Sequence, residues 1–415
     1  MDSFLTAPQW GAMRRWHLPA ATLFALGAWG LAAAAEDPAT PPDAQTAPPA
    51  AVPPDESAQA SAPAAAPPKA DEHSQLHGSF ELDNQHSVDT DPLRATLALS
   101  YSNLFSKPDE LSALYEVAPQ DAKQVSAFVA SYVSHPLPEG LQPSIYFIDS
   151  STNVPNADTA GALGKGQTLG FRLSHAFSAA APQAAQSVTL AVEYKHYRDT
   201  LVTDDSPEAQ TPISYLNLSL AYASTWSSAQ REAAVTVSAN YGPHGGANSA
   251  GAYADDDFRA NSNYFYVRAD GEIVTSLPQG FRLYLRAAGQ YSHESLNINE
   301  DYPIAGIDGV RGYLEAEVLG DRALKGTMQL QSPAWQRGTR QVADAFVFFD
   351  AGVAEMLQNL PGEPMHAHPR SWGLGIGLAP VKGVTASLVW ARPLVSAIAT
   401  HADESRVLFV LRTSF

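Results

Sequence analysis

Residues 301–333 read DYPIAGIDGVRGYLEAEVLGDRALKGTMQLQSP. The first half of this stretch, through Gly320, is rich in glycine and in charged residues, and its centre is the run from Val310 to Tyr313. The second half alternates between small or apolar residues and polar ones, with Leu324, Gly326, Met328 and Leu330 on one face and Lys325, Thr327, Gln329 and Gln331 on the other. Alternation with a period of two is typical of a β-strand whose faces meet different surroundings. The stretch therefore predicts a long loop that leads into such a strand.

The same period of two recurs through the chain from Leu76 to its end. A soluble β-sandwich and a membrane barrel both alternate in this way, so the alternation alone does not distinguish them. The predicted strands begin near Leu76, Arg94, Glu110, Lys123, Ser144, Thr168, Gln186, Ser214, Glu232, Tyr264, Phe281, Leu324, Asp344, Ser371, Val384 and Arg406.

Three further features favour a barrel in an outer membrane. The strand candidates run about ten residues, which is the length needed to cross a bilayer at a tilt. Short connections such as 276–280 alternate with long ones such as 151–167, 200–212 and 292–322, as periplasmic turns alternate with surface loops. Aromatic residues lie at strand ends, where an interfacial girdle would place them. We therefore predict an all-β fold: a transmembrane barrel of about 16 antiparallel strands over residues 73–415, with the long loop between strands 11 and 12. The girdle candidates are Tyr101, Tyr194, Tyr222, Tyr241, Tyr291 and Trp390.

The N-terminal region has the pattern of a targeting segment. Arg14 and Arg15 precede an apolar run, 18–35, that ends in four alanines before Glu36. This predicts a secretory signal peptide over residues 1–35, with Met13 as a second possible start and a retained anchor helix as the alternative. Residues 36–72 are almost all Ala, Pro, Gln, Ser and acidic residues, so we expect a disordered periplasmic spacer there.

The last ten residues, RVLFVLRTSF, alternate up to the C-terminus. One face carries Phe415, Leu411 and Phe409. A C-terminal Phe that ends an alternating strand resembles the assembly signal of outer-membrane barrels, and an ordinary edge strand is the alternative reading.

Composition excludes several other functions. A net charge of −18 and a pI near 5.0 argue against a nucleic-acid partner. The chain has no cysteine and none of the common hydrolase, zinc-protease or phosphate-loop motifs, so we expect neither an enzyme nor a cofactor. His366 and His368 are weak metal candidates, and 255–257 is read as a solvated acidic loop rather than a calcium site.

The run Val310-Arg311-Gly312-Tyr313, followed by Gly320-Asp321-Arg322 and a strand, resembles the signature of the two-partner secretion transporters. These form the haemolysin activation and secretion branch of the BamA superfamily. The resemblance covers about Leu76 to Phe415, with two departures: Gly306 stands where a Gly pair is frequent, and Gly309 stands where a Ser is frequent.

The resemblance implies a pairing between two distant motifs. In the family the loop folds into the lumen, and its Arg pairs with the Asp of a Phe-x-Asp-x-Gly motif, which here is Phe348, Asp350 and Gly352 on strand 13. The alternation independently turns Asp350 inward, because a carboxylate facing lipid would be very costly. Arg311 would be the Arg of this pair; the alternative reading is a solvated charge on a surface loop.

The function that the resemblance implies is export of a partner polypeptide through the lumen of a barrel in the outer membrane of a Gram-negative bacterium. Its expected partners are outer-membrane lipid, the barrel assembly machinery and the secreted polypeptide. The periplasmic POTRA modules of the family would fall in 36–72, which offers neither their pattern nor their length, so we expect none there. A passive pore or structural barrel is the second hypothesis, and an outer-membrane hydrolase the third.

Overall fold

A computed structural model describes residues 76–415, apart from 89, 106–107, 139, 158–159, 179–183, 204–205, 210–211, 244–262, 338–339 and 359–364. The predicted signal peptide (1–35) and spacer (36–72) lie outside the described residues, as does the acidic run 255–257. No helix in the described part is long and apolar enough to cross a bilayer.

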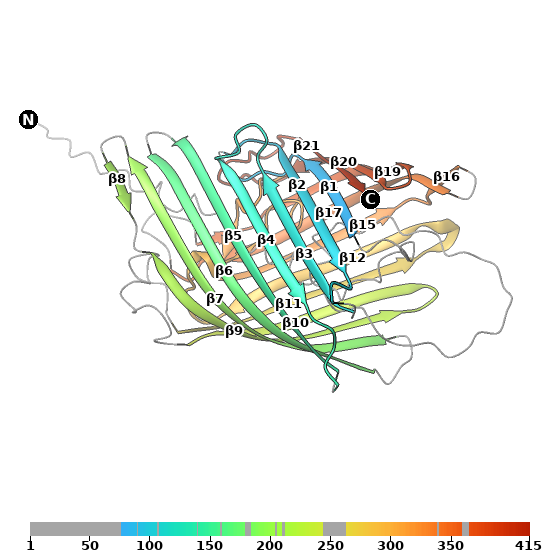
Figure 1. Ribbon diagram of the computed structural model, residues 1–415. Coiled ribbons are helices and arrows are strands. Elements are labelled where there is room, and N and C mark those ends of the chain that lie inside the picture. Colours follow the sequence, from blue (N-terminus) through green and yellow to red (C-terminus); the bar gives the residue numbers. More distant parts are fainter. Residues whose placement is uncertain are drawn as a thin grey trace, which may run out of the picture.

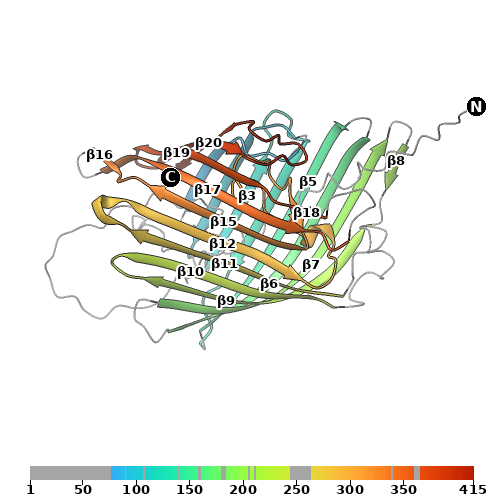
Figure 2. The ribbon, with the colours of Figure 1, turned by 180° about the vertical axis from the view of Figure 1, so that it is seen from behind.

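Sixteen antiparallel strands form one closed barrel, as the sequence pattern predicted (Figures 1 and 2). Figure 1 shows the wall formed by the blue and green strands in front, and Figure 2 shows the wall that continues from β9 to β20. The spanning strands are β1 (Leu76–Asp83), β2 (Arg94–Ser102), β3 (Glu110–Val117), β4 (Val125–Val133), β5 (Leu141–Ala157), β6 (Ala160–Ser178), β7 (Ala184–Thr203), β9 (Ile213–Ser227), β10 (Arg231–Gly242), β11 (Tyr264–Ser276), β12 (Arg282–Ser292), β15 (Arg322–Gln331), β17 (Arg340–Glu355), β19 (Arg370–Val381), β20 (Val384–Pro393) and β21 (Arg406–Ser414).

Shorter elements lie in the connections. They are β8 (Ser206–Ala209), η3 (Pro278–Gly280), η4 (Ile298–Glu300), β13 (Tyr302–Pro303), β14 (Leu319–Gly320), β16 (Trp335–Arg337) and β18 (His366–Ala367). The two-stranded pair β13–β14 and the single turn η4 belong to the connection between β12 and β15. This connection, residues 293–321, is called the long loop below. It joins the eleventh and twelfth spanning strands, as predicted.

The barrel closes where the first strand meets the last. β1 pairs with β21 over Ser79–Asp83 and Val410–Ser414, and the N–H and C=O groups of Gly78 and Phe415 bond to each other at 3.0 and 2.9 Å. The side chain of Asn84 continues the contact beyond the strand end, because its amide donates to the carbonyl of Val407 and its oxygen accepts from the N–H of Phe409, both at 2.8 Å. This closing seam therefore joins the first and the last spanning strand, so that neither has a free edge along the paired residues.

The two faces of the wall differ as a membrane barrel requires. Along β17, Val347 and Phe349 are exposed on the outer face, whereas Phe348 and Asp350 between them are buried on the inner face. The same inversion runs along β7, where Val192 and Tyr194 face outward and Glu193 and Lys195 are buried inside. Apolar side chains thus meet lipid, and polar side chains line the lumen.

The sequence-based prediction was wrong about the length of three strands, β5, β6 and β7, which are longer than predicted. The predicted surface loop 151–167 is mostly strand, since β5 runs to Ala157 and β6 begins at Ala160. The predicted loop 200–212 likewise contains the end of β7 and all of β8. These segments continue beyond the length needed to cross a bilayer, where an apolar outer face is no longer required. Their sequences therefore lack the alternation on which the prediction depended.

Candidate functional site: the long loop inside the barrel

The long loop is buried along most of its length against inward-facing side chains of the barrel. Its apolar residues Ile304, Val310 and Tyr313 pack with Ala323 on β15 and Ala354 on β17. Burial of a surface connection in this way requires partners for its polar groups, because an unpaired polar group away from water is costly. The contacts below supply partners for most of the charged side chains that hold the loop in place.

Arg311 and Asp350 meet inside the barrel. The guanidinium donates to both carboxylate oxygens, from Nε to Oδ2 at 2.7 Å and from NH2 to Oδ1 at 2.9 Å, and the backbone N–H of Arg311 donates to Oδ2 at 3.2 Å. Asp350 is fully buried and Arg311 is 7% exposed. A bidentate pair of this kind holds the loop in one position and neutralises the buried carboxylate. The guanidinium presents two N–H donors in one plane, which matches the two oxygens of the carboxylate.

The rest of the guanidinium is also in contact. Its NH1 group donates to the side-chain oxygen of Gln329 at 2.9 Å, and its carbon lies 3.5 Å from the ring centre of Phe348. A cation above an aromatic face is attracted by the ring, and more strongly where water is excluded. Phe348 and Asp350, two residues apart on β17, thus contact the face and the edge of the same guanidinium.

Two glycines allow the loop to approach the wall. Gly312 has a φ of +94°, a conformation that side-chain-bearing residues rarely adopt. A Cβ on Gly352 would lie 3.0 Å from Ile304 and 3.3 Å from Val310, which is closer than nearly all real contacts. Glycine at these two positions therefore lets the loop lie close to the wall, where Arg311 reaches Asp350.

The C-terminal part of the long loop is tied to the connection between β20 and β21. The hydroxyl of Tyr313 donates to the carbonyl of Val395 at 2.6 Å. The carboxylate of Glu317 accepts from the N–H groups of Ala399 and Thr400 at 2.6 and 2.7 Å, and from the Thr400 hydroxyl at 2.6 Å. The loop therefore spans from the middle of the wall to the surface-side connection beside the seam.

The N-terminal part of the loop makes a third contact, which the sequence analysis missed. Glu300 is fully buried and accepts from Lys195 on β7, Tyr215 on β9 and Tyr266 on β11. Opposite charges two residues apart on one strand face, as at Glu193 and Lys195, are a signal for a buried ion pair. Glu300, which joins this pair in the structure, could not be predicted from the sequence, because it lies in a loop without periodicity.

Asp321, in the predicted Gly320–Arg322 motif, fixes the end of the loop. It is fully buried, and its two carboxylate oxygens accept from the N–H groups of Leu296 at 2.5 Å and Leu357 at 2.7 Å. The neighbouring Arg322 donates to the carbonyl of Ser292 at 2.7 Å. The start and the end of the long loop are thus held together where it leaves the wall.

Comparison with known proteins assigns this architecture. The family model described as haemolysin secretion/activation protein ShlB/FhaC/HecB matches residues 69–379, which is more than half of the chain. The chain belongs to this family. A barrel of this type lies in the outer membrane of Gram-negative bacteria. No curated protein sequence matches the chain.

Solved structures share the fold of this family member. CdiB from Escherichia coli is similar with a TM-score of 0.67 and 15% identity over 83% of this chain and 64% of that one. CdiB from Acinetobacter baumannii gives 0.64 and 16% over 82% and 60%. BamA from Haemophilus ducreyi lacking POTRA domains 1–3 gives 0.57 and 12% over 82% and 70%. The chain therefore spans less than two thirds of the length of both CdiB structures.

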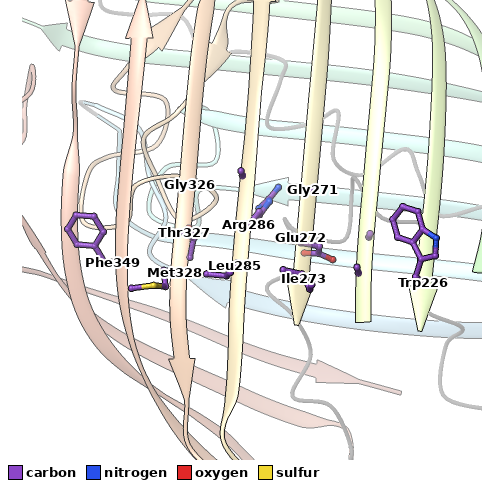
Figure 3. A pocket seen from close by; sticks show the side chains of 13 residues that line it. Trp226, Gly271, Glu272, Ile273, Leu285, Arg286, Gly326, Thr327, Met328 and Phe349 are labelled. Atoms are coloured by element: carbon purple, nitrogen blue, oxygen red, sulfur yellow. The ribbon is translucent and has the colours of Figure 1, made fainter. Parts of the chain in front are cut away.

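The outer wall of this ShlB/FhaC/HecB barrel carries a shallow apolar depression of about 590 Å³ (Figure 3). Gly271, Ala287 and Gly326 are register neighbours on β11, β12 and β15, and the larger side chains of Met328 and Phe349 stand beside them. Because the exposed side chains that surround it are apolar, this depression belongs to the surface that meets lipid rather than to the lumen.

The C-terminal residues predicted as an assembly signal lie on the outer face of the seam. Phe415 and Leu411 are exposed, and Phe409 is half-buried. The ring of Phe415 lies over Gly78 of β1, in space that any larger residue at 78 would need.

No group of three or more metal-ligating side chains lies together in the described part of the chain. His366 is in β18 and His368 follows that strand.

One titratable group in the loop predicts a pH dependence. Burial, together with the nearby carboxyl of Asp308, raises the pKa of Glu315 to about 8, although Glu315 also accepts from the N–H of Ile307 at 2.7 Å. The folded protein therefore holds this proton more tightly than the unfolded chain, whose glutamate has a pKa near 4.5. The sign follows from linkage: the contribution of Glu315 to stability falls as pH rises between these two values, and the loop is held least firmly above about pH 8.

We therefore expect the loop to loosen as pH rises. In planar bilayers the barrel should show more frequent current fluctuations at about pH 9 than at about pH 6, and Glu315→Gln should remove most of this difference. Glu404→Gln, which changes an exposed acid between β20 and β21, is the matched control and should leave the difference intact. Equal pH dependence in the Glu315→Gln variant and the parent would contradict the prediction.

Proposed function

We propose that this chain is the outer-membrane translocator of a two-partner secretion system and exports a partner polypeptide through its lumen. The observation that supports this best is the long loop held inside a ShlB/FhaC/HecB barrel by the pairing of Arg311 with Asp350. A loop held by a buried ion pair can block the lumen at rest and still be displaced as a unit.

In this proposal, export means that the exported chain replaces the long loop in the lumen. The loop leaves the polar inner face, and the exported chain passes along it in an unfolded form, with folding outside the cell providing the direction. No cofactor and no catalytic step are involved, and we assign the protein no enzymatic activity.

The proposal includes two further partners. The exposed apolar side chains of the outer face, such as Val347, Phe349 and Leu374, would contact outer-membrane lipid. The barrel assembly machinery would recognise the last strand through Phe415, Leu411 and Phe409.

Comparison of secreted proteins tests this function. Cells of the natural host that lack the chain should lose one large polypeptide from the medium, as measured by mass spectrometry, and re-expression should restore it. Re-expression of the Glu404→Gln variant should restore it equally. If the medium is unchanged while the purified barrel conducts ions, the passive-pore hypothesis replaces this one.

A further inference from the structure

The segment Ser295–Asp301 of the long loop lies in a site of its own on the inner wall. All seven of its residues are buried, although they belong to a connection on the surface side of the barrel. Leu296 packs among apolar and aromatic side chains of three strands, and Glu300 contacts the polar side chains beside them. The apolar set is Tyr197, Ile213, Tyr215, Tyr264 and Tyr266.

The polar part of the site is built to hold a carboxylate. The ammonium of Lys195 and the hydroxyls of Tyr215 (2.7 Å) and Tyr266 (2.6 Å) all donate to the side-chain oxygens of Glu300. Lys195 is fully buried, and the two tyrosines are at most 3% exposed. The three donors come from β7, β9 and β11, which belong to the wall and not to the loop.

The backbone of the segment is bound as well. The carbonyl of Glu300 accepts from Arg268 at 3.0 Å and from Gln290 at 3.1 Å. A polypeptide with an apolar residue four positions before an acidic one therefore meets three kinds of partner at this site: an aromatic pocket, a carboxylate site and side-chain donors for its main chain.

Glu300 balances the charges of the three wall groups nearest to it. Lys195 and Arg268 bring two positive charges, and Glu193, 3.6 Å from Lys195, and Glu300 bring two negative ones. Burial acts to raise the pKa of Glu300, but Lys195 and Arg268 outweigh it, so its pKa lies below the ordinary value and the group is ionised. If the loop moves away, these wall groups keep one positive charge in excess, and the hydroxyls of Tyr215 and Tyr266 lose the carboxylate that accepts from them.

We propose that Lys195, Tyr215 and Tyr266 form a carboxylate-binding site that takes an acidic residue of a passing polypeptide, and that Glu300 is its resident occupant at rest. An incoming acidic segment replaces Glu300 and restores the charge balance that loop departure removes. The identification of the passing polypeptide as an exported chain rests on the proposed function. The existence of the carboxylate-binding site does not rest on it. The site is also separate from the pairing of Arg311 with Asp350, which involves β17.

Cysteine labelling measures whether Glu300 holds the segment. The chain has no cysteine, so a single Ser295→Cys substitution gives a signal without background, and Ser295 is only 4% exposed. In the purified barrel, maleimide should label this cysteine slowly. Adding Glu300→Gln should raise the labelling rate about tenfold or more, because the lost ion pair loosens the segment. A gel shift on heating confirms that each variant is folded.

Two synthetic heptapeptides test the exchange. One has the sequence of residues 295–301, SLNINED, and the other, SLNINQD, differs only by Gln in place of Glu. Added in excess to the Ser295→Cys barrel with Glu300 present, the first should speed labelling and the second should not. Fluorescently tagged SLNINED should bind the Glu300→Gln barrel at least tenfold more tightly than SLNINQD, and Lys195→Met should abolish this preference.

Equal effects of the two peptides, or no effect of either, would overturn the proposal, as would unchanged labelling after Glu300→Gln. If Glu300→Gln or Lys195→Met does not fold, the competition experiment in the barrel with Glu300 still decides. These measurements use purified protein and do not depend on secretion. A chain that binds the acidic peptide but exports nothing would refute the proposed function and leave the site in place.

Discussion

Replacing Arg311 or Asp350 by alanine should destabilise the seated loop by about 3–5 kcal/mol, because each substitution leaves the other charge buried without a partner. Both residues are almost fully buried, and their bidentate contact joins the loop to β17. Both variants should therefore give the same phenotype: frequent large current fluctuations in planar bilayers and reduced secretion.

The double variant should be little worse than either single one, because the pair acts as a unit. Arg311→Lys should rescue poorly, since an ammonium cannot bond both carboxylate oxygens in the same plane. Arg392 and Asp403 provide a matched control: they form an Arg–Asp pair at 3.0 Å, but on the exposed surface. Removing that pair should change the current traces little. Additive effects of the two buried substitutions would show that they act independently.

Deleting Phe415 should prevent most of the protein from assembling. The backbone of Phe415 makes the last two hydrogen bonds of the seam with Gly78, and its ring covers that glycine. Because Phe415 is 69% exposed, its side chain contributes little to the stability of the finished barrel, so its importance lies in assembly. The deleted protein should accumulate in the periplasm and be degraded by added protease.

Phe415→Ala separates the two contributions. It keeps the backbone bonds and loses the ring, so it should lower the yield of folded barrel while the fraction that does assemble melts at nearly the parent temperature. Phe415→Tyr, which retains an aromatic ring, is the control and should assemble well. A normal heat-dependent gel shift and full yield after deletion of Phe415 would be incompatible with this role.

The sequence predicted the number and order of the strands because each crossing needs an apolar face toward lipid. That requirement produces the alternation at positions such as Val347 to Asp350, and it ends where the strands leave the bilayer. The extensions of β5, β6 and β7 have no such requirement, so their composition of small and polar residues reads as loop.

The site was predictable to the extent that it carries motifs. Arg311 and Asp350 stand in recognisable runs, and the structure brings them together. Glu300 stands in a segment, SLNINED, that has neither a period nor a motif. Its contact with Lys195 depends on how the loop folds back over a distance of 105 residues in the chain, which local patterns do not encode.

The unequal strand lengths have a consequence for the exit of a chain from the lumen. β7 has 20 residues and β1 has 8, which at about 3.3 Å per residue correspond to roughly 66 and 26 Å along the strands. β7 and β9 lie on the side of the barrel opposite the seam. Six spanning strands separate β1 from β9, and seven separate β9 from β21. The rim of the barrel is therefore high on one side and low on the other. Under the proposed function, an emerging polypeptide would meet the extended β5, β6 and β7 on one side and the short β1 and β2 on the other, so its first extracellular residues would leave across the short strands beside the seam.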